Sequence, residues 1–168
     1  LVPKMGLIAL SGAPGSYKSW ITQHLALCVA SGEPFFGQFE IEQGKVLIID
    51  EEDPKSLIQK RFNLLGAIKD NELLGKEIHF LDKHFLVDDK DLMERICNYI
   101  ALNEIKLVII DSLVRIYQGK DENSANHMAE VFRKLREFQD VGSAVLFTHH
   151  HRKQAITTRN IPSESMRG

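Results

Sequence analysis

Apolar and amphipathic stretches alternate along the chain. Five short runs are apolar at consecutive positions, which is typical of strands buried on both faces of a sheet. These strands are predicted over residues 6–12, 44–54, 77–82, 105–113 and 143–151. Four stretches between them carry apolar residues at every third or fourth position, as amphipathic helices do. These helices are predicted over residues 18–30, 56–65, 91–102 and 123–142.

The order of these elements predicts the fold class. Strands that alternate with helices pair in parallel, because each crossover helix carries the chain back to the same edge of the sheet. We therefore expect an α/β fold with a mostly parallel sheet flanked by helices on both faces. Ligands of such sheets bind at the carboxyl ends of the strands, and four of the predicted strands end in polar or glycine-rich residues.

Composition and charge narrow the class of protein. With 168 residues, 43% of them apolar and 26% charged, the chain has the balance of one soluble globular domain. No apolar run approaches the ~20 residues of a membrane span and no signal-peptide pattern opens the chain, so we expect no membrane association and a cytoplasmic location. The net charge of −2 argues against a constitutive nucleic-acid coat, but a local or oligomeric basic groove stays open. Cys28 and Cys97 fall in helical patterns and are predicted to be buried thiols.

The segment "SGAPGSYKSW" (11–20) has the character of a phosphate-binding loop. It follows a predicted strand, opens a predicted helix and resembles the pattern G-x-x-x-x-G-K-[ST]. Gly12 and Gly15 let backbone N–H groups approach phosphate oxygens, Lys18 would reach the β- and γ-phosphates, and the Ser19 hydroxyl would bind Mg²⁺. ATP and Mg²⁺ are therefore the expected cofactors. The residues predicted to contact them are Gly12, Ala13, Pro14, Gly15, Ser16, Tyr17, Lys18, Ser19 and Trp20.

Tyr17 departs from this pattern, which has glycine before the lysine. Glycine at this position often takes a backbone conformation that bulky residues tolerate poorly. Two interpretations follow: the loop is slightly remodelled, or Tyr17 keeps ordinary dihedral angles and stacks near the nucleotide. Because the lysine and the hydroxyl are both retained, we expect a functional site.

Acidic residues end two of the predicted strands. Asp111 follows four apolar residues and is predicted to organise Mg²⁺ together with Ser19, although it could instead cap the following turn. Glu52 is the expected general base, orienting water toward the γ-phosphate. Glu51 and Asp53 are competitors, although Asp53, which precedes a proline, has the character of a turn or helix-start residue. A merely solvated acidic turn stays open.

Histidines end the last predicted strand. His149 and His150 are expected to hydrogen-bond the γ-phosphate and to signal its hydrolysis, although a structural role for either is open. His151, Arg152 and Lys153 extend this group into a basic edge.

With these residues in place, the chain resembles a RecA-like P-loop ATPase of the AAA type, and most of all the RepA-type hexameric helicases. The segments that carry the resemblance are "GAPGSYKS", "IIDEEDP", "LVIIDSL", "DENSANHM" and "LFTHHHRK". The resemblance assigns phosphate and metal contacts to Lys18 and Ser19, catalysis to Glu52 and the metal shell to Asp111. For γ-phosphate sensing it favours His150 over His149, because RecA-like proteins carry their sensing glutamine at that position.

The resemblance also implies an assembly and a partner. Such proteins form rings, often hexamers, with each nucleotide between subunits and with single-stranded DNA in the central channel. The loop 115–126 would face that DNA, although an ordinary solvated loop is an equal alternative. Its candidate DNA contacts are Arg115, Tyr117 and Lys120.

The family normally continues beyond the last predicted strand, through further strands and a residue that acts on the neighbouring subunit. We therefore expect residues 1–168 to form a single RecA-like ATPase core, truncated at its C-terminal end. Arg152, Lys153 and Arg167 are candidates for contacts with a neighbour or DNA. The expected function is an ATP-hydrolysing DNA helicase or motor in replication or recombination. A nucleotide-dependent switch is the alternative, and a small-molecule kinase is disfavoured because no arginine-bearing lid is evident.

Overall fold

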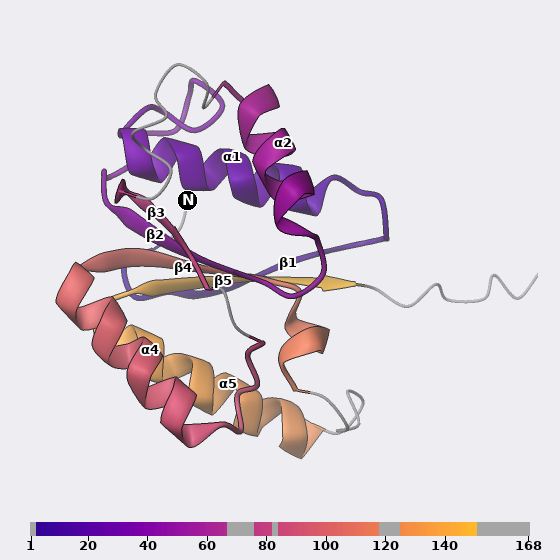
Figure 1. The fold of residues 1–168 in the computed structure, drawn as a ribbon, viewed down its shortest axis with the longest axis vertical. Coiled ribbons are helices and arrows are strands. Elements are labelled where there is room, and N and C mark those ends of the chain that lie inside the picture. Colours follow the sequence, from indigo (N-terminus) through magenta and orange to yellow (C-terminus); the bar gives the residue numbers. More distant parts are fainter. Residues whose placement is uncertain (1–2, 67–75, 82–83, 118–124, 151–168) are drawn as a thin grey trace, which may run out of the picture.

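A parallel sheet forms the centre of the molecule, seen edge-on in Figure 1. The structure, a computed structural model, describes residues 3–66, 76–81, 84–117 and 125–150. Its strands are β1 (Leu7–Gly12), β2 (Lys45–Asp50), β3 (Ile78–Phe80), β4 (Ile105–Asp111) and β5 (Ala144–His150). Their order is β1-β5-β4-β2-β3, and each neighbouring pair is parallel. The predicted α/β fold is confirmed.

Helices cover both faces of the sheet. They are α1 (Lys18–Ser31), α2 (Lys55–Leu64), α4 (Lys90–Asn103), α5 (Ala125–Asp140) and the short 3₁₀ helix η2 (Leu113–Ile116). Figure 1 shows α1 and α2 on one face and α4 and α5 on the other. The four predicted helices agree closely with α1, α2, α4 and α5, whereas η2 was not predicted.

Two hydrophobic clusters, one on each face, fix the direction in which each strand residue points. Val46 and Ile48 of β2 pack with the α1 cluster, whereas Leu47 and Ile49 pack with the cluster that contains α4 and α5. The residues of β4 and β5 alternate in the same way, as the two-residue period of a strand requires. Side chains at the strand ends therefore divide between the two faces according to their position in this alternation.

The sheet order brings the predicted chemistry to one edge. All strands are parallel, so the carboxyl ends of β1, β2, β4 and β5 lie at the same edge of the sheet. Strand β5 lies between β1 and β4, and it pairs Gly12 with His150. Strand β2 flanks β4 on the other side and pairs Asp50 with Asp111.

Both cysteines are free thiols. Cys28 is buried in α1, as expected, whereas Cys97 in α4 is only half-buried. Desolvation raises the pKa of the Cys97 thiol to about 11. In the described segments, no helix combines the length and the apolar character that crossing a membrane requires.

Candidate nucleotide site

The segment between β1 and α1 folds as a compact loop. The N–H of Ser16 donates to the carbonyl oxygen of Ala13 at 3.2 Å, which closes a turn. A Cβ atom on Gly12 would lie 2.7 Å from the Ser16 hydroxyl oxygen, so a larger residue there would force the Ser16 side chain to move. Gly15 has a φ of 77°, which glycine adopts without strain.

Lys18 lies inside this loop. The residue is only 6% exposed. Its Nζ donates to the carbonyl oxygens of Gly12 at 3.1 Å and Ala13 at 3.0 Å. The ammonium group is therefore held where the phosphates of a nucleotide would bind, at the N-terminus of α1.

Tyr17 takes the backbone conformation of the glycine that it replaces. Its φ is 62° and its ψ is 21°, in the left-handed region, at the N-cap of α1. The interpretation in which Tyr17 keeps ordinary dihedral angles is therefore wrong. The residue is 73% exposed, so no burial of the ring offsets the backbone strain.

Replacing Tyr17 with glycine is expected to stabilise the protein. The left-handed conformation costs a non-glycine residue about 1–2 kcal/mol, whereas glycine loses about 0.5–1 kcal/mol more chain entropy on folding. The free energy of unfolding should therefore rise by up to about 1.5 kcal/mol, measured by urea denaturation. Tyr17→Ala is the matched control, because it removes the ring and keeps the strain. If Tyr17→Gly were no more stable than Tyr17→Ala, the claim of backbone strain at residue 17 would be contradicted.

A cavity of about 310 Å³ lies between the loop and the segment that follows β2. Its wall includes Glu52, so the predicted base lies beside the phosphate loop. The residues that line it are Pro14, Gly15, Ser16, Tyr17, Lys18, Ser19, Trp20, Glu52, Asp53 and Arg61. Most of the predicted nucleotide contacts thus share one cavity with the predicted base.

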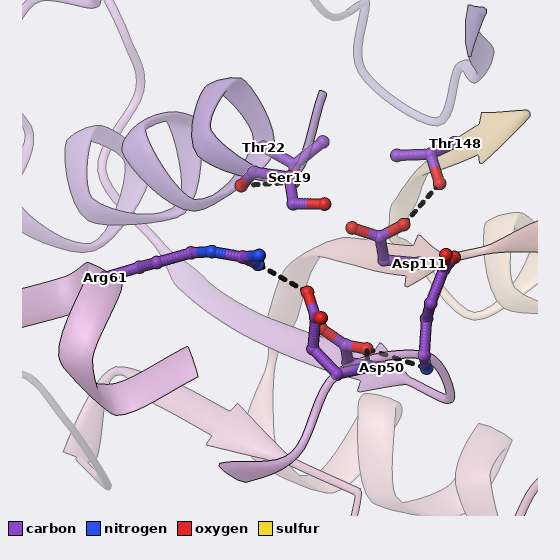
Figure 2. A network of polar contacts seen from close by, with 8 residues as sticks. Ser19, Thr22, Asp50, Arg61, Asp111 and Thr148 are labelled. Carbon is purple, nitrogen blue, oxygen red and sulfur yellow. Dashed lines mark hydrogen bonds and ion pairs between the residues drawn. The ribbon is translucent and has the colours of Figure 1, made fainter. Parts of the chain in front are cut away.

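Arg61 was missed by the sequence analysis. It lies on α2, forms an ion pair with Asp53, and its guanidinium carbon lies 5.9 Å from the centre of the Trp20 ring. Figure 2 shows the side chain reaching across from α2 toward the end of β2. A cation at this place is suited to an anionic ligand in the cavity. The ion pair with Arg61 also gives Asp53 a structural partner.

Asp111 lies at the end of β4 with one oxygen engaged and one without a partner. The Thr148 hydroxyl donates to Oδ1 at 2.5 Å (Figure 2). Oδ2 is buried and has no hydrogen-bond partner among the described residues. An unpaired buried carboxylate oxygen is costly unless a ligand or water completes it. The Asp111 side chain lies on the α1 face, where Ser19 is in the first turn of α1, so this oxygen fits the shell of a hydrated magnesium ion.

Asp50 organises the turn that carries the predicted base. Its Oδ1 accepts hydrogen bonds from the N–H groups of Glu52 at 3.0 Å and Asp53 at 2.9 Å. Desolvation raises the pKa of the Asp50 carboxyl to about 6. The two N–H donors lower this pKa, and the negative charge of Asp111 raises it further. Asp50 was not among the predicted site residues.

Asp50→Asn is expected to stabilise the folded protein at neutral and alkaline pH. The pKa is raised above its ordinary value of 3.8, so the folded state holds this proton more tightly than the unfolded chain does. Stability from this group is therefore greatest below about pH 4 and is lost as the pH rises through about 6. After allowance for solvent screening, the substitution should add about 1–2 kcal/mol near pH 8 and almost nothing below pH 4. Urea denaturation measures the free energy of unfolding of both proteins. A difference between wild type and Asp50→Asn that stays the same at all pH values would contradict the raised pKa.

Glu51 lies away from the cavity. Its Oε2 is 2.7 Å from His84 Nδ1, and its Oε1 accepts the N–H of Phe85 at 2.7 Å. Phe85 belongs to the cluster on the α4 and α5 face. Of the three acidic residues that follow β2, Glu52 and Asp53 line the cavity, and Asp53 is paired with Arg61.

The end of β5 separates the two candidate histidines. Val145 and Phe147 pack on the α4 and α5 face, so the alternation puts His149 on that face, away from the α1 side. Its Nδ1 is buried and has no partner among the described residues. The side chain of His150 lies outside the described atoms, and its sensing role stays a prediction.

The predicted DNA loop is only partly described. The chain passes from Asp111 through a cis peptide bond to Ser112 and into η2. Tyr117 is 4% exposed and belongs to the core, so its prediction as a stacking residue is wrong; the turn of η2 directs it inward. Arg115 is exposed, as a DNA contact requires. The other predicted contacts with DNA or a neighbour lie outside the described residues: Lys120, Arg152, Lys153 and Arg167. His151, predicted as part of a basic edge, also lies outside them.

A parallel sheet, a phosphate loop that holds a buried lysine, and acidic residues at the adjacent strand ends define a RecA-like P-loop nucleoside triphosphatase fold. A family model described as an AAA domain matches residues 1–155, and the chain belongs to this family. It is accordingly a nucleotide-binding ATPase domain of the AAA type.

Proposed function

We propose that this domain hydrolyses Mg²⁺-ATP and acts as a RecA-like motor on single-stranded DNA, as the RepA-type helicases that it resembles do. The observation that carries the hydrolytic part is that Glu52 lines the same cavity as Lys18 and Ser19. A site that only binds nucleotide needs the phosphate loop, but it does not need a carboxylate beside it.

The chain's own groups account for phosphate binding and for activation of water. The β- and γ-phosphates would bind to the N–H groups of the loop and to the Lys18 ammonium, which then exchanges the Gly12 and Ala13 carbonyls for phosphate oxygens. Glu52 would accept a proton from the water that attacks the γ-phosphorus. The Arg61 guanidinium, on the wall of the cavity, would stabilise the charge on the phosphate oxygens.

Two residues would hold magnesium. The Ser19 hydroxyl would bind the ion directly, and Asp111 would accept a hydrogen bond from its water through the unpaired Oδ2. When bound, Mg²⁺ neutralises negative charge on the β- and γ-phosphates. The Thr148 hydroxyl holds the Asp111 carboxylate in orientation for this role.

The proposed assembly is a ring, a hexamer in the manner of the RepA-type helicases, with His150 sensing the γ-phosphate. Exposed Arg115 and the chain after η2 would meet single-stranded DNA. The cavity is open to one side, as shown by the exposure of Tyr17 and Glu52, which is compatible with a neighbouring subunit completing it.

Steady-state phosphate release in the presence and absence of single-stranded DNA tests the motor. We expect turnover to rise on addition of DNA and the stimulation to weaken with increasing salt, because phosphate contacts release counterions. Turnover that DNA leaves unchanged at low salt would contradict the motor and favour the alternative, a nucleotide-dependent switch.

A further inference from the structure

The residue before the proposed base makes contacts on the opposite face of the sheet. The Glu51 side chain is only 13% exposed, and both of its carboxylate oxygens are engaged. Oε2 lies 2.7 Å from His84 Nδ1, and Oε1 accepts the Phe85 N–H at 2.7 Å. The Glu51 N–H donates to the carbonyl oxygen of Asp111 at 2.8 Å. Glu51 therefore joins the ends of β2 and β4 to the segment that precedes α4.

That segment contacts η2 directly. The N–H of Val87 donates to the carbonyl oxygen of Ile116 at 2.9 Å, and both side chains are almost completely buried. Phe85 is fully buried in the same cluster. Polar contacts within such a close-packed region transmit displacement, because the surrounding side chains leave little space for independent movement.

We propose that Glu51 is a positioning residue that couples nucleotide binding at Glu52 to η2. Glu52 lines the nucleotide cavity, whereas Glu51, one residue earlier, holds residues 84–87 on the other face. A shift of the turn when Glu52 engages the water beside the γ-phosphate moves the Glu51 backbone with it. This inference rests on the nucleotide binding and on the role of Glu52 in the proposed function.

Hydrogen exchange measures this coupling directly, because the amides of Phe85 and Val87 donate to the two linking acceptors. The probe is Mg²⁺ with a non-hydrolysable ATP analogue at saturation. In the wild type, we expect exchange to change by about fivefold or more in segments 84–90 and 113–117, the scale of a measurable coupling between sites. Protection of residues 11–20 reports nucleotide binding in the same experiment.

Glu51→Ala is expected to abolish the response in 84–90 and 113–117 and to leave the protection of 11–20 in place. Glu51→Gln, which keeps an acceptor for the Phe85 amide, should restore part of the response even if the alanine variant is less stable. Lys134→Ala is the matched control: it removes a 2.5 Å ion pair from α5 to Asp88, on the same segment but outside the Glu51 link, and should respond as the wild type does.

Three results would overturn the coupling. One is a wild-type response confined to residues 11–20, and another is an unchanged response in Glu51→Ala. The third is a response lost equally in Lys134→Ala, which would show that any loosening of the segment suffices. Absence of protection at 11–20 in the wild type would instead refute nucleotide binding, and with it the proposed function, so the two failures are distinguishable.

Discussion

Glu52→Gln is expected to bind Mg²⁺-ATP and to hydrolyse it about 10²- to 10⁴-fold more slowly than the wild type, the usual contribution of a general base. Glutamine keeps the size of the side chain and its hydrogen-bonding capacity, but it cannot accept the proton of the attacking water. Because Glu52 is exposed, its replacement removes no core packing. Single-turnover phosphate release measures the chemical step without product release.

A matched variant separates this effect from a general change in charge. Glu94→Gln alters an exposed glutamate on α4, on the face of the sheet opposite α1, and should hydrolyse ATP at the wild-type rate. Unchanged turnover in Glu52→Gln would contradict the assignment. If turnover were then lost in Glu51→Gln, the base would have to be Glu51, despite its contacts with His84 and Phe85.

Lys18→Ala is expected to weaken ATP binding by about 100-fold or more. The ammonium is almost completely buried in the loop, and loss of a buried charge from an ion pair costs about 2–5 kcal/mol, or roughly 30- to several thousand-fold in affinity. Trp20 is the only tryptophan of the chain and lines the cavity, so its fluorescence reports binding without a label.

Lys90→Ala, at the start of α4 on the other face of the sheet, is the control for loss of a surface lysine and should bind ATP normally. Lys18 also donates hydrogen bonds to the carbonyl oxygens of Gly12 and Ala13, which the alanine variant loses. Thermal unfolding of both variants must therefore show that the fold stays intact. Wild-type affinity in a folded Lys18→Ala protein would contradict the phosphate role of this residue.

The fold could be predicted because its strands are apolar at consecutive positions, whereas its helices are apolar at every third or fourth position. The sheet order β1-β5-β4-β2-β3 could not, since it depends on which strands meet after the chain crosses the sheet. The short helix η2 was missed for a related reason: its four residues are too few for a helical period to emerge. Tyr117 shows the same limit, because its burial follows from neighbours distant in sequence.

The candidate site was predicted to the extent that its residues end strands. Lys18, Ser19, Glu52 and Asp111 all follow apolar runs, and parallel strands bring such ends to one edge. Arg61 was not predicted, because it reaches the cavity from the far end of a helix, where an arginine ordinarily lies in solvent.

The roles of the acidic residues at the end of β2 differ because their side chains point in different directions. Asp50, Glu51 and Glu52 are consecutive carboxylates, and no sequence pattern states which of them points toward α1. The structure ties Asp50 to the turn, joins Glu51 to the opposite face and leaves Glu52 on the wall of the cavity.

Phosphate release from Mg²⁺-ATP by the wild-type protein, measured alongside Trp20 fluorescence, tests the central claim most directly. The account predicts saturable turnover that requires Mg²⁺ and that follows the same ATP concentration dependence as the change in Trp20 fluorescence. Saturable ATP binding without detectable turnover, with and without single-stranded DNA, would contradict hydrolysis at this site and would indicate a switch.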